Sequence, residues 1–217
     1  MVLSFPLGTP DLADLVPIQS AHWQPMWQQE TSGTGAGELL AADLGPQLWE
    51  ADVTLKAVRN SEARAVKSRI EALGGARHAF YLYDPINCYP THDPGGTILG
   101  DNEVTILAVG GDNRTLSLAG LPAGYVLAHD MLASDYGSPS RRALLRMVDT
   151  VTADGDGETA LFEVTPALRP GIAAGQTVML KKPAAKVKIL PGTLSYDDAS
   201  TNRTRIRFRV RQTLQAG

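Results

Sequence analysis

The chain has 217 residues, 43% of them hydrophobic, with 21 glycines, 14 prolines and a net charge of −3. This length and apolar content suffice for one large or two small folded domains, and they exclude a wholly disordered chain. No stretch approaches the roughly 18 apolar residues of a membrane span, and residues 1–10 lack the basic and apolar regions of a secretory signal. We therefore expect a soluble protein with no membrane contact, which its own sequence does not direct to secretion.

The first predicted element is an extended strand region over residues 16–30, which contains Trp23 and Trp27. The segment TSGTGAGE at residues 31–38 then predicts a flexible loop. This loop is not expected to bind phosphate, because Glu38 takes the place of the last glycine of G-x-G-x-x-G and no Lys-Ser/Thr pair follows.

A strand is predicted over Trp49–Lys56, where apolar and polar residues alternate strictly. Its polar face includes Glu50 and Asp52. An amphipathic helix is predicted over Ser61–Leu73, because apolar residues recur at a helical spacing and Asn60 or Ser61 can cap the first turn. These apolar residues are Val66, Ile70 and Leu73, and Gly74-Gly75 ends the helix.

After the helix, a short strand in HAFYLYDP is followed by the Pro/Gly/Asn-rich segment INCYPTHDPGGTILGD, which is typical of a domain boundary. Regular short strands with turns then fill residues 97–183 and predict a small antiparallel barrel or sandwich. The expected strands lie around Val104–Ala108, TLSLAG, His129–Asp135, Arg142–Thr152, Thr159–Thr165 and Gln176–Lys182. If the last strand of the chain pairs with Trp49–Lys56, residues 97–183 are an insertion into a domain made of residues 1–88 and 185–217.

The closing segment Thr204–Arg211 alternates Ile206, Phe208 and Val210 with arginines, which indicates a folded strand and not a disordered basic arm. Residues 181–217 carry nine Lys/Arg and two Asp, a net charge of +7, so the first 180 residues carry −10. We expect the arginines to pair with carboxylates on the neighbouring strand, within the fold or at a subunit boundary. The alternative is a surface that meets another subunit or DNA. The candidate residues for these structural or interface charge pairs are Arg205, Arg207, Arg209, Glu50 and Asp52.

No catalytic, cofactor or metal motif stands out. Asp154, Asp156 and Glu158 have the spacing of a calcium loop, but the sixth position is Thr159 and the twelfth is Thr165, which favours a solvated turn. The histidines, at positions 22, 78, 92 and 129, are scattered, so a shared metal would require the fold to gather them.

Two further constellations also have simpler explanations. His92-Asp93 with Ser138 or Ser140 could form a hydrolase set, but no G-x-S-x-G elbow supports it. The three tryptophans, at positions 23, 27 and 49, could line a sugar-binding surface, although aromatic residues on strands belong more often to a core or an interface. A single cysteine, Cys88, can form no internal disulfide. We therefore expect no enzyme activity and no cofactor.

Five segments are informative when taken together: GPQLWEADVTLKAV, the helix ending IEALGG, FYLYDP, DPGGTILG, and PGTLSY before a closing alternating strand. Together they resemble the distal tail proteins of long-tailed, siphovirus-type bacteriophages and of related prophages or gene-transfer particles. The resemblance extends from about Gly45 to Thr213 and rests on structural motifs, so no binding residue is carried over.

The resemblance implies a mainly β subunit, with a tail-tube-like β-sandwich that carries one helix and is interrupted by a small barrel. The barrel of some relatives resembles an oligonucleotide/oligosaccharide-binding (OB) fold, which would allow contact with a host-surface glycan. Six such subunits form a ring that joins the tail tube protein to the tip or baseplate proteins around the DNA exit channel. The expected location is then the virion tail, after synthesis in the bacterial host cytoplasm, with no specific nucleic-acid site. The alternatives are a carbohydrate-binding module for host recognition and, further back, a tail-associated glycan hydrolase.

Overall fold

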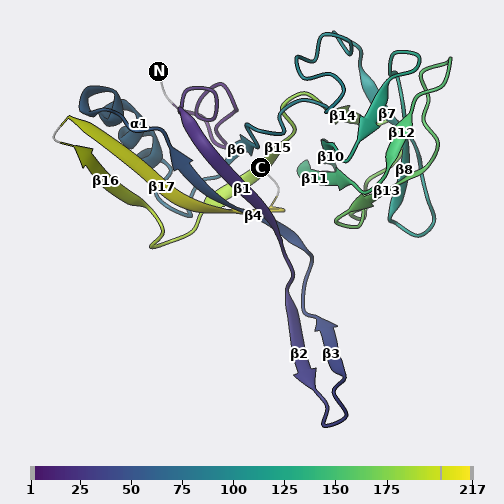
Figure 1. Cartoon of the computed structure of the whole chain (residues 1–217), viewed down its shortest axis with the longest axis horizontal. Helices are drawn as coiled ribbons and strands as arrows, with labels where there is room; N and C mark the ends of the chain where they lie inside the picture. Colours follow the sequence, from purple (N-terminus) through teal and green to yellow (C-terminus); the bar gives the residue numbers. More distant parts are fainter. Residues whose placement is uncertain (1–2, 201, 216–217) are drawn as a thin grey trace.

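The computed structural model describes residues 3–200 and 202–215 of the chain. Strands dominate it, and the described residues contain one α-helix. A seven-stranded sheet covered by the helix lies beside a closed six-stranded barrel, and a two-stranded arm projects away from both (Figure 1). The fold class expected from the sequence, mainly β with one helix and a small antiparallel barrel, is confirmed.

The seven-stranded sheet follows the order β1-β4-β17-β15-β6, and β5 and β16 also pair with β17. All of these pairings are antiparallel. The strands are β1 (Ile18–Met26), β4 (Leu48–Leu55), β5 (Val58–Arg59), β6 (Phe80–Tyr83), β15 (Ala184–Ile189), β16 (Ser195–Ser200) and β17 (Arg203–Gln212). The sheet therefore combines strands that precede the barrel with strands that follow it.

The pairing of β4 with β17 agrees with the alternation in their sequences. Arg209 lies opposite Asp52, and Arg211 lies opposite Glu50. Because side chains alternate between the two faces of a strand, this register sends the apolar residues of both strands to the same face. Those residues are Ala51, Val53 and Leu55 from β4, and Ile206, Phe208 and Val210 from β17, and all are buried.

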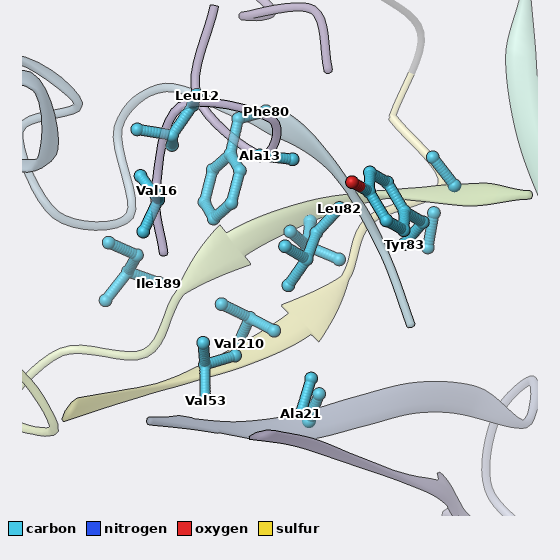
Figure 2. Close-up of a cluster of buried hydrophobic side chains, with 14 of the residues drawn as sticks. Leu12, Ala13, Val16, Ala21, Val53, Phe80, Leu82, Tyr83, Ile189 and Val210 are labelled. Atoms are coloured by element: carbon cyan, nitrogen blue, oxygen red, sulfur yellow. The ribbon is translucent and has the colours of Figure 1, made fainter. Parts of the chain in front are cut away.

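The apolar face of the sheet is covered by helix α1 (Asn60–Ala72) and by the N-terminal segment. Leu12 and Val16 of that segment lie over Phe80, Ile189 and Val210 from three strands (Figure 2). Thus one sheet with a helical and irregular cover makes this core, where the resemblance implied a two-sheet sandwich. On the opposite face, β4 and β17 carry charged side chains.

The helix begins one residue earlier than expected, and its N-terminus differs from the prediction. Arg59 is the N-cap residue and forms no side-chain capping bond. Asn60, the expected cap, instead accepts a hydrogen bond from the Thr204 hydroxyl, which ties the first turn to β17. The C-terminus is as predicted, since Gly74 and Gly75 both have positive φ angles that favour glycine.

The barrel closes in the order β10-β11-β13-β8-β7-β14. Its strands are β7 (Val104–Val109), β8 (Thr115–Ala119), β10 (Met131–Tyr136), β11 (Arg141–Met147), β13 (Phe162–Thr165) and β14 (Thr177–Met179). The strand expected over Arg142–Thr152 is in fact two strands, because the chain turns after Met147 and begins β12 (Thr150–Thr152). This strand pairs with β9 (Val126–Ala128), which the sequence did not predict.

Contacts between the barrel and the sheet centre on Trp49. Its indole Nε1 donates a hydrogen bond of 2.8 Å to the carbonyl oxygen of Leu144 on β11. The guanidinium of Arg146 lies 5.2 Å from the Trp49 ring centroid, and that of Arg142 lies 4.5 Å from the centroid of Tyr81 on β6. Met131, Ala133 and Leu144 of the barrel belong to the same buried cluster as the sheet residues. That residues 97–183 form a separable domain therefore stays a prediction.

The arm is the main departure from the predicted secondary structure. The extended region expected at residues 16–30 is interrupted after β1, and β2 (Gln29–Gly33) begins a hairpin with β3 (Leu39–Asp43). The glycine-rich segment expected to be a flexible loop, residues 31–38, supplies the last three residues of β2 and the turn that leads to β3. Every described residue of both strands is exposed.

Candidate functional site

The polar side of the sheet carries a dense set of charges, which we call the charged face. It is formed by alternate residues of β4, β15 and β17, since their neighbours point into the core. Its members are Glu50, Asp52, Lys186, Lys188 and four of the five arginines of β17, and we call these four the arginine row: Arg205, Arg207, Arg209 and Arg211.

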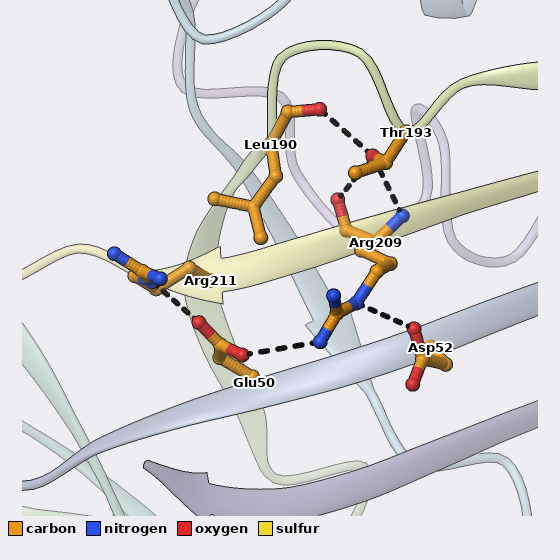
Figure 3. Close-up of polar contacts among 6 residues, drawn as sticks. All are labelled: Glu50, Asp52, Leu190, Thr193, Arg209 and Arg211. Atoms are coloured by element: carbon orange, nitrogen blue, oxygen red, sulfur yellow. Dashed lines mark hydrogen bonds and ion pairs between the residues drawn. The ribbon is translucent and has the colours of Figure 1, made fainter. Parts of the chain in front are cut away.

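Glu50 is the centre of an ion-pair network on this face (Figure 3). Its carboxylate accepts a hydrogen bond of 2.6 Å from Nε of Arg211 and lies 3.5 Å from a terminal nitrogen of Arg209. Nε of Arg209 also pairs with Asp52 at 2.8 Å. The two carboxylates differ in environment, because the Glu50 side chain is 9% exposed and that of Asp52 is 53% exposed.

The other members of the arginine row have different surroundings. Arg207 lies 3.7 Å from Asp197 on β16 and not beside Glu50 or Asp52. Nε of Arg205 is buried and has no hydrogen-bond acceptor among the described residues. The structure thus brings Arg209 together with both predicted carboxylates, and adds Arg211, which was not among the candidates. The contribution of these pairs to stability stays a prediction.

The arm is the second candidate surface. Both of its faces are exposed, and it carries the adjacent residues Leu39 and Leu40, of which Leu39 is 73% exposed. Trp27 and Leu44 at its base are also exposed. An isolated two-stranded hairpin is marginally stable in water, so an arm with exposed leucines is typical of a segment that packs against another chain.

The calcium-loop and hydrolase candidates have structural roles instead. Oδ1 of Asp154 accepts hydrogen bonds from the backbone N–H groups of Asp156 and Glu158, which makes this segment a tight turn. Asp93 is buried and accepts hydrogen bonds from three backbone N–H groups of residues 97–99 and from the Tyr125 hydroxyl. Burial alone would raise the pKa of Asp93, but these hydrogen bonds bring it below the ordinary value. Asp93 therefore anchors the crossing between sheet and barrel.

The predicted metal and sugar-binding residues also lie in ordinary surroundings. Within the described ranges, no group of three His, Cys, Asp or Glu side chains could hold a metal ion. Trp49 is buried and Trp23 is half-buried, while Trp27 is exposed, so the three tryptophans form no common exposed platform. Among the described residues, no helix is long and apolar enough to span a membrane.

Comparison with known proteins adds no assignment to these surfaces. The chain matches no protein-family model, and no curated protein matches its sequence. The candidate function therefore rests on the arm and the sequence motifs.

Proposed function

We propose that this chain is a structural subunit of a bacteriophage tail, a distal tail hub protein whose copies form a closed ring. The ring would have six members and would join the tail tube to the tip or baseplate. The observation that carries the proposal is the arm, a hairpin with two exposed leucines that leaves the body of the subunit. The motifs shared with distal tail proteins supply the choice of assembly.

An arm that packs on the next copy makes a head-to-tail interface, and such an interface generates a ring when the rotation closes. The arm offers two exposed leucines on opposite faces of one strand, and full burial of a leucine side chain contributes about 1.5–3 kcal/mol. Replacing both with serine would then remove on the order of 3 kcal/mol from each interface. That loss corresponds to an affinity roughly a hundredfold weaker.

The test is the native mass of the full chain at micromolar concentration, for the wild type and for a variant with Leu39→Ser and Leu40→Ser. We expect a sixfold assembly for the wild type and dissociation of the variant. The matched control is Leu161→Ser, because Leu161 is 55% exposed on the barrel and should leave the assembly intact. A strictly monomeric wild type, or a variant that assembles as well as the wild type, would contradict the proposal. Electron micrographs of assembled tails would give the copy number directly.

The carbohydrate-binding alternative makes a different demand. It requires a monomer that binds a glycan through exposed aromatic groups, whereas Trp49 lies in the core at the contact with the barrel. A hydrolase would need two carboxylates across a cleft, and Asp93 is occupied by backbone N–H groups. No contact in the described chain favours either alternative over the ring hub.

A further inference from the structure

A small pocket at the edge of the charged face collects positive charge. It has a volume of about 170 Å³ and lies between the N-terminal segment, the connection from α1 to β6, β15 and residues 213–215. Four of its lining side chains are lysine, arginine or histidine, and among the described residues its lining includes no Asp or Glu. These four are Arg77, His78, Lys186 and Lys188.

Lys186 is the most informative of these residues, because its side chain is enclosed. The residue is 4% exposed, and Nζ donates a hydrogen bond of 3.1 Å to the backbone carbonyl of Gln215. Lys188 donates to the side-chain oxygen of the same glutamine at 3.0 Å. Both acceptors are neutral oxygen atoms, so neither lysine gains a counter-charge from them, and a buried charge without a counter-charge is costly. Each ammonium group also has three N–H donors, of which these hydrogen bonds use one. Burial, and then the charge of Lys188, lower the pKa of Lys186.

Within residues 3–200 and 202–215, the surroundings do not supply the missing negative charge. Lys188 lies directly opposite Arg211 on β17, so two cations face each other across the strands. Glu50, on the next strand, is already engaged by Arg211 and Arg209. On the other side of the pocket, the ring of His78 stacks on Phe5 with 4.0 Å between centroids, which holds the imidazole in place. The pocket is therefore a preformed cavity with unused donors and an excess of positive charge.

We propose that this pocket binds a small oxyanion, a phosphate or carboxylate group, with Lys186 and Lys188 as its principal donors. Arg77, which is exposed, also lines the pocket and adds a guanidinium group to it. The volume of the pocket suits such a group. A water molecule occupies about 30 Å³ in the liquid, and the pocket volume of about 170 Å³ is several times larger. Ion pairs with ammonium and guanidinium groups are the strong form of hydrogen bond, and partial enclosure strengthens them further.

The test is isothermal titration of the full chain with inorganic phosphate and, separately, with acetate, at constant ionic strength. The pocket variant is Lys186→Met, which keeps the side-chain length and removes the charge. The matched control is Lys56→Met, because Lys56 is exposed outside the pocket. We expect saturable binding of at least one anion by the wild type and by Lys56→Met, and affinity reduced at least about tenfold in Lys186→Met. The preferred anion identifies the source of the ligand as a phosphate or a carboxylate group.

A second variant covers the case in which Lys186→Met does not fold. Arg77→Gln changes an exposed residue and should weaken binding severalfold without altering the melting temperature. Absence of saturable binding of both anions by the wild type would overturn the proposal. Equal affinity of the wild type and the pocket variants would overturn it as well.

Discussion

Glu50 and Asp52 share Arg209 as a partner, and their unequal burial predicts unequal contributions to stability. Glu50→Gln removes the charge that Arg209 and Arg211 both approach, and hydrogen bonds to charged groups contribute about 1.5–3 kcal/mol. The arginines are 45% and 44% exposed, so water can replace part of the loss, and we expect a cost of about 1.5–2 kcal/mol. Asp52→Asn disrupts an exposed pair, for which about 0–1 kcal/mol is typical.

The measurement is urea unfolding of both variants, followed by tryptophan fluorescence, with the slope m compared to confirm that the same surface unfolds. Added salt should reduce the effect of Asp52→Asn more than that of Glu50→Gln, because screening acts mainly on exposed charges. The reasoning fails if Asp52→Asn costs as much as Glu50→Gln, or if neither change alters the urea midpoint.

Three further predictions concern the barrel, the arginine row, and an ion pair in which Nζ of Lys182 lies 2.7 Å from the Asp14 carboxylate. Replacing residues 97–183 with a short linker should leave a remainder that keeps its helix, as measured by circular dichroism, and that melts cooperatively. The melting temperature should be lower, because Trp49 loses its contacts with the barrel. Loss of cooperative melting would show that sheet and barrel share one core. Fluorescence anisotropy should detect no micromolar, salt-dependent binding of duplex DNA that depends on Arg205, Arg207 and Arg209 of the arginine row, since these residues belong to a half-buried strand. If such binding were measured, and if replacing the three arginines with alanine abolished it at an unchanged melting temperature, this interpretation would be refuted. Burial alone would raise the pKa of Asp14, but hydrogen bonds, first that from Lys182, bring it below 3.8. The destabilisation by Asp14→Asn should therefore be present at neutral pH and disappear as the pH falls below 3.8, and a pH-independent effect in thermal melts would contradict the ion pair.

The alternation in the sequence was enough to predict the strand β17, its partner β4 and the face on which each side chain lies. A period of two specifies which residues are buried, and opposite charges on two polar faces indicate which strands can be neighbours. The individual ion pairs between side chains were harder to predict from the sequence. Arg207 meets Asp197 on β16. That strand was not predicted, because SYDDAS lacks apolar alternation.

The arm was missed for a related reason. Periodicity reports which face of a strand is buried, and the strands of the arm are exposed on both faces, so TSGTGAGE has the composition of a loop. The burial of Glu50 and of Lys186 also could not be predicted. Their burial depends on strands that come together from distant parts of the chain. The local sequence around Glu50 or Lys186 does not indicate which side chains will cover these two residues.

The position of β17 within the sheet sets the order in which this protein can fold. Glu50 and Arg211 are 161 residues apart in the chain, and β4 has no neighbour on that side until β17 is available. The barrel strands, by contrast, lie within one continuous stretch and can pair as soon as that stretch has been made. We therefore expect the barrel to form first during synthesis, while β1 and β4 wait as an open hairpin with an unpaired edge. A chaperone that binds unpaired strand edges would therefore bind β4 during this stage of synthesis, and would not bind β4 in the folded protein, where β17 covers that edge.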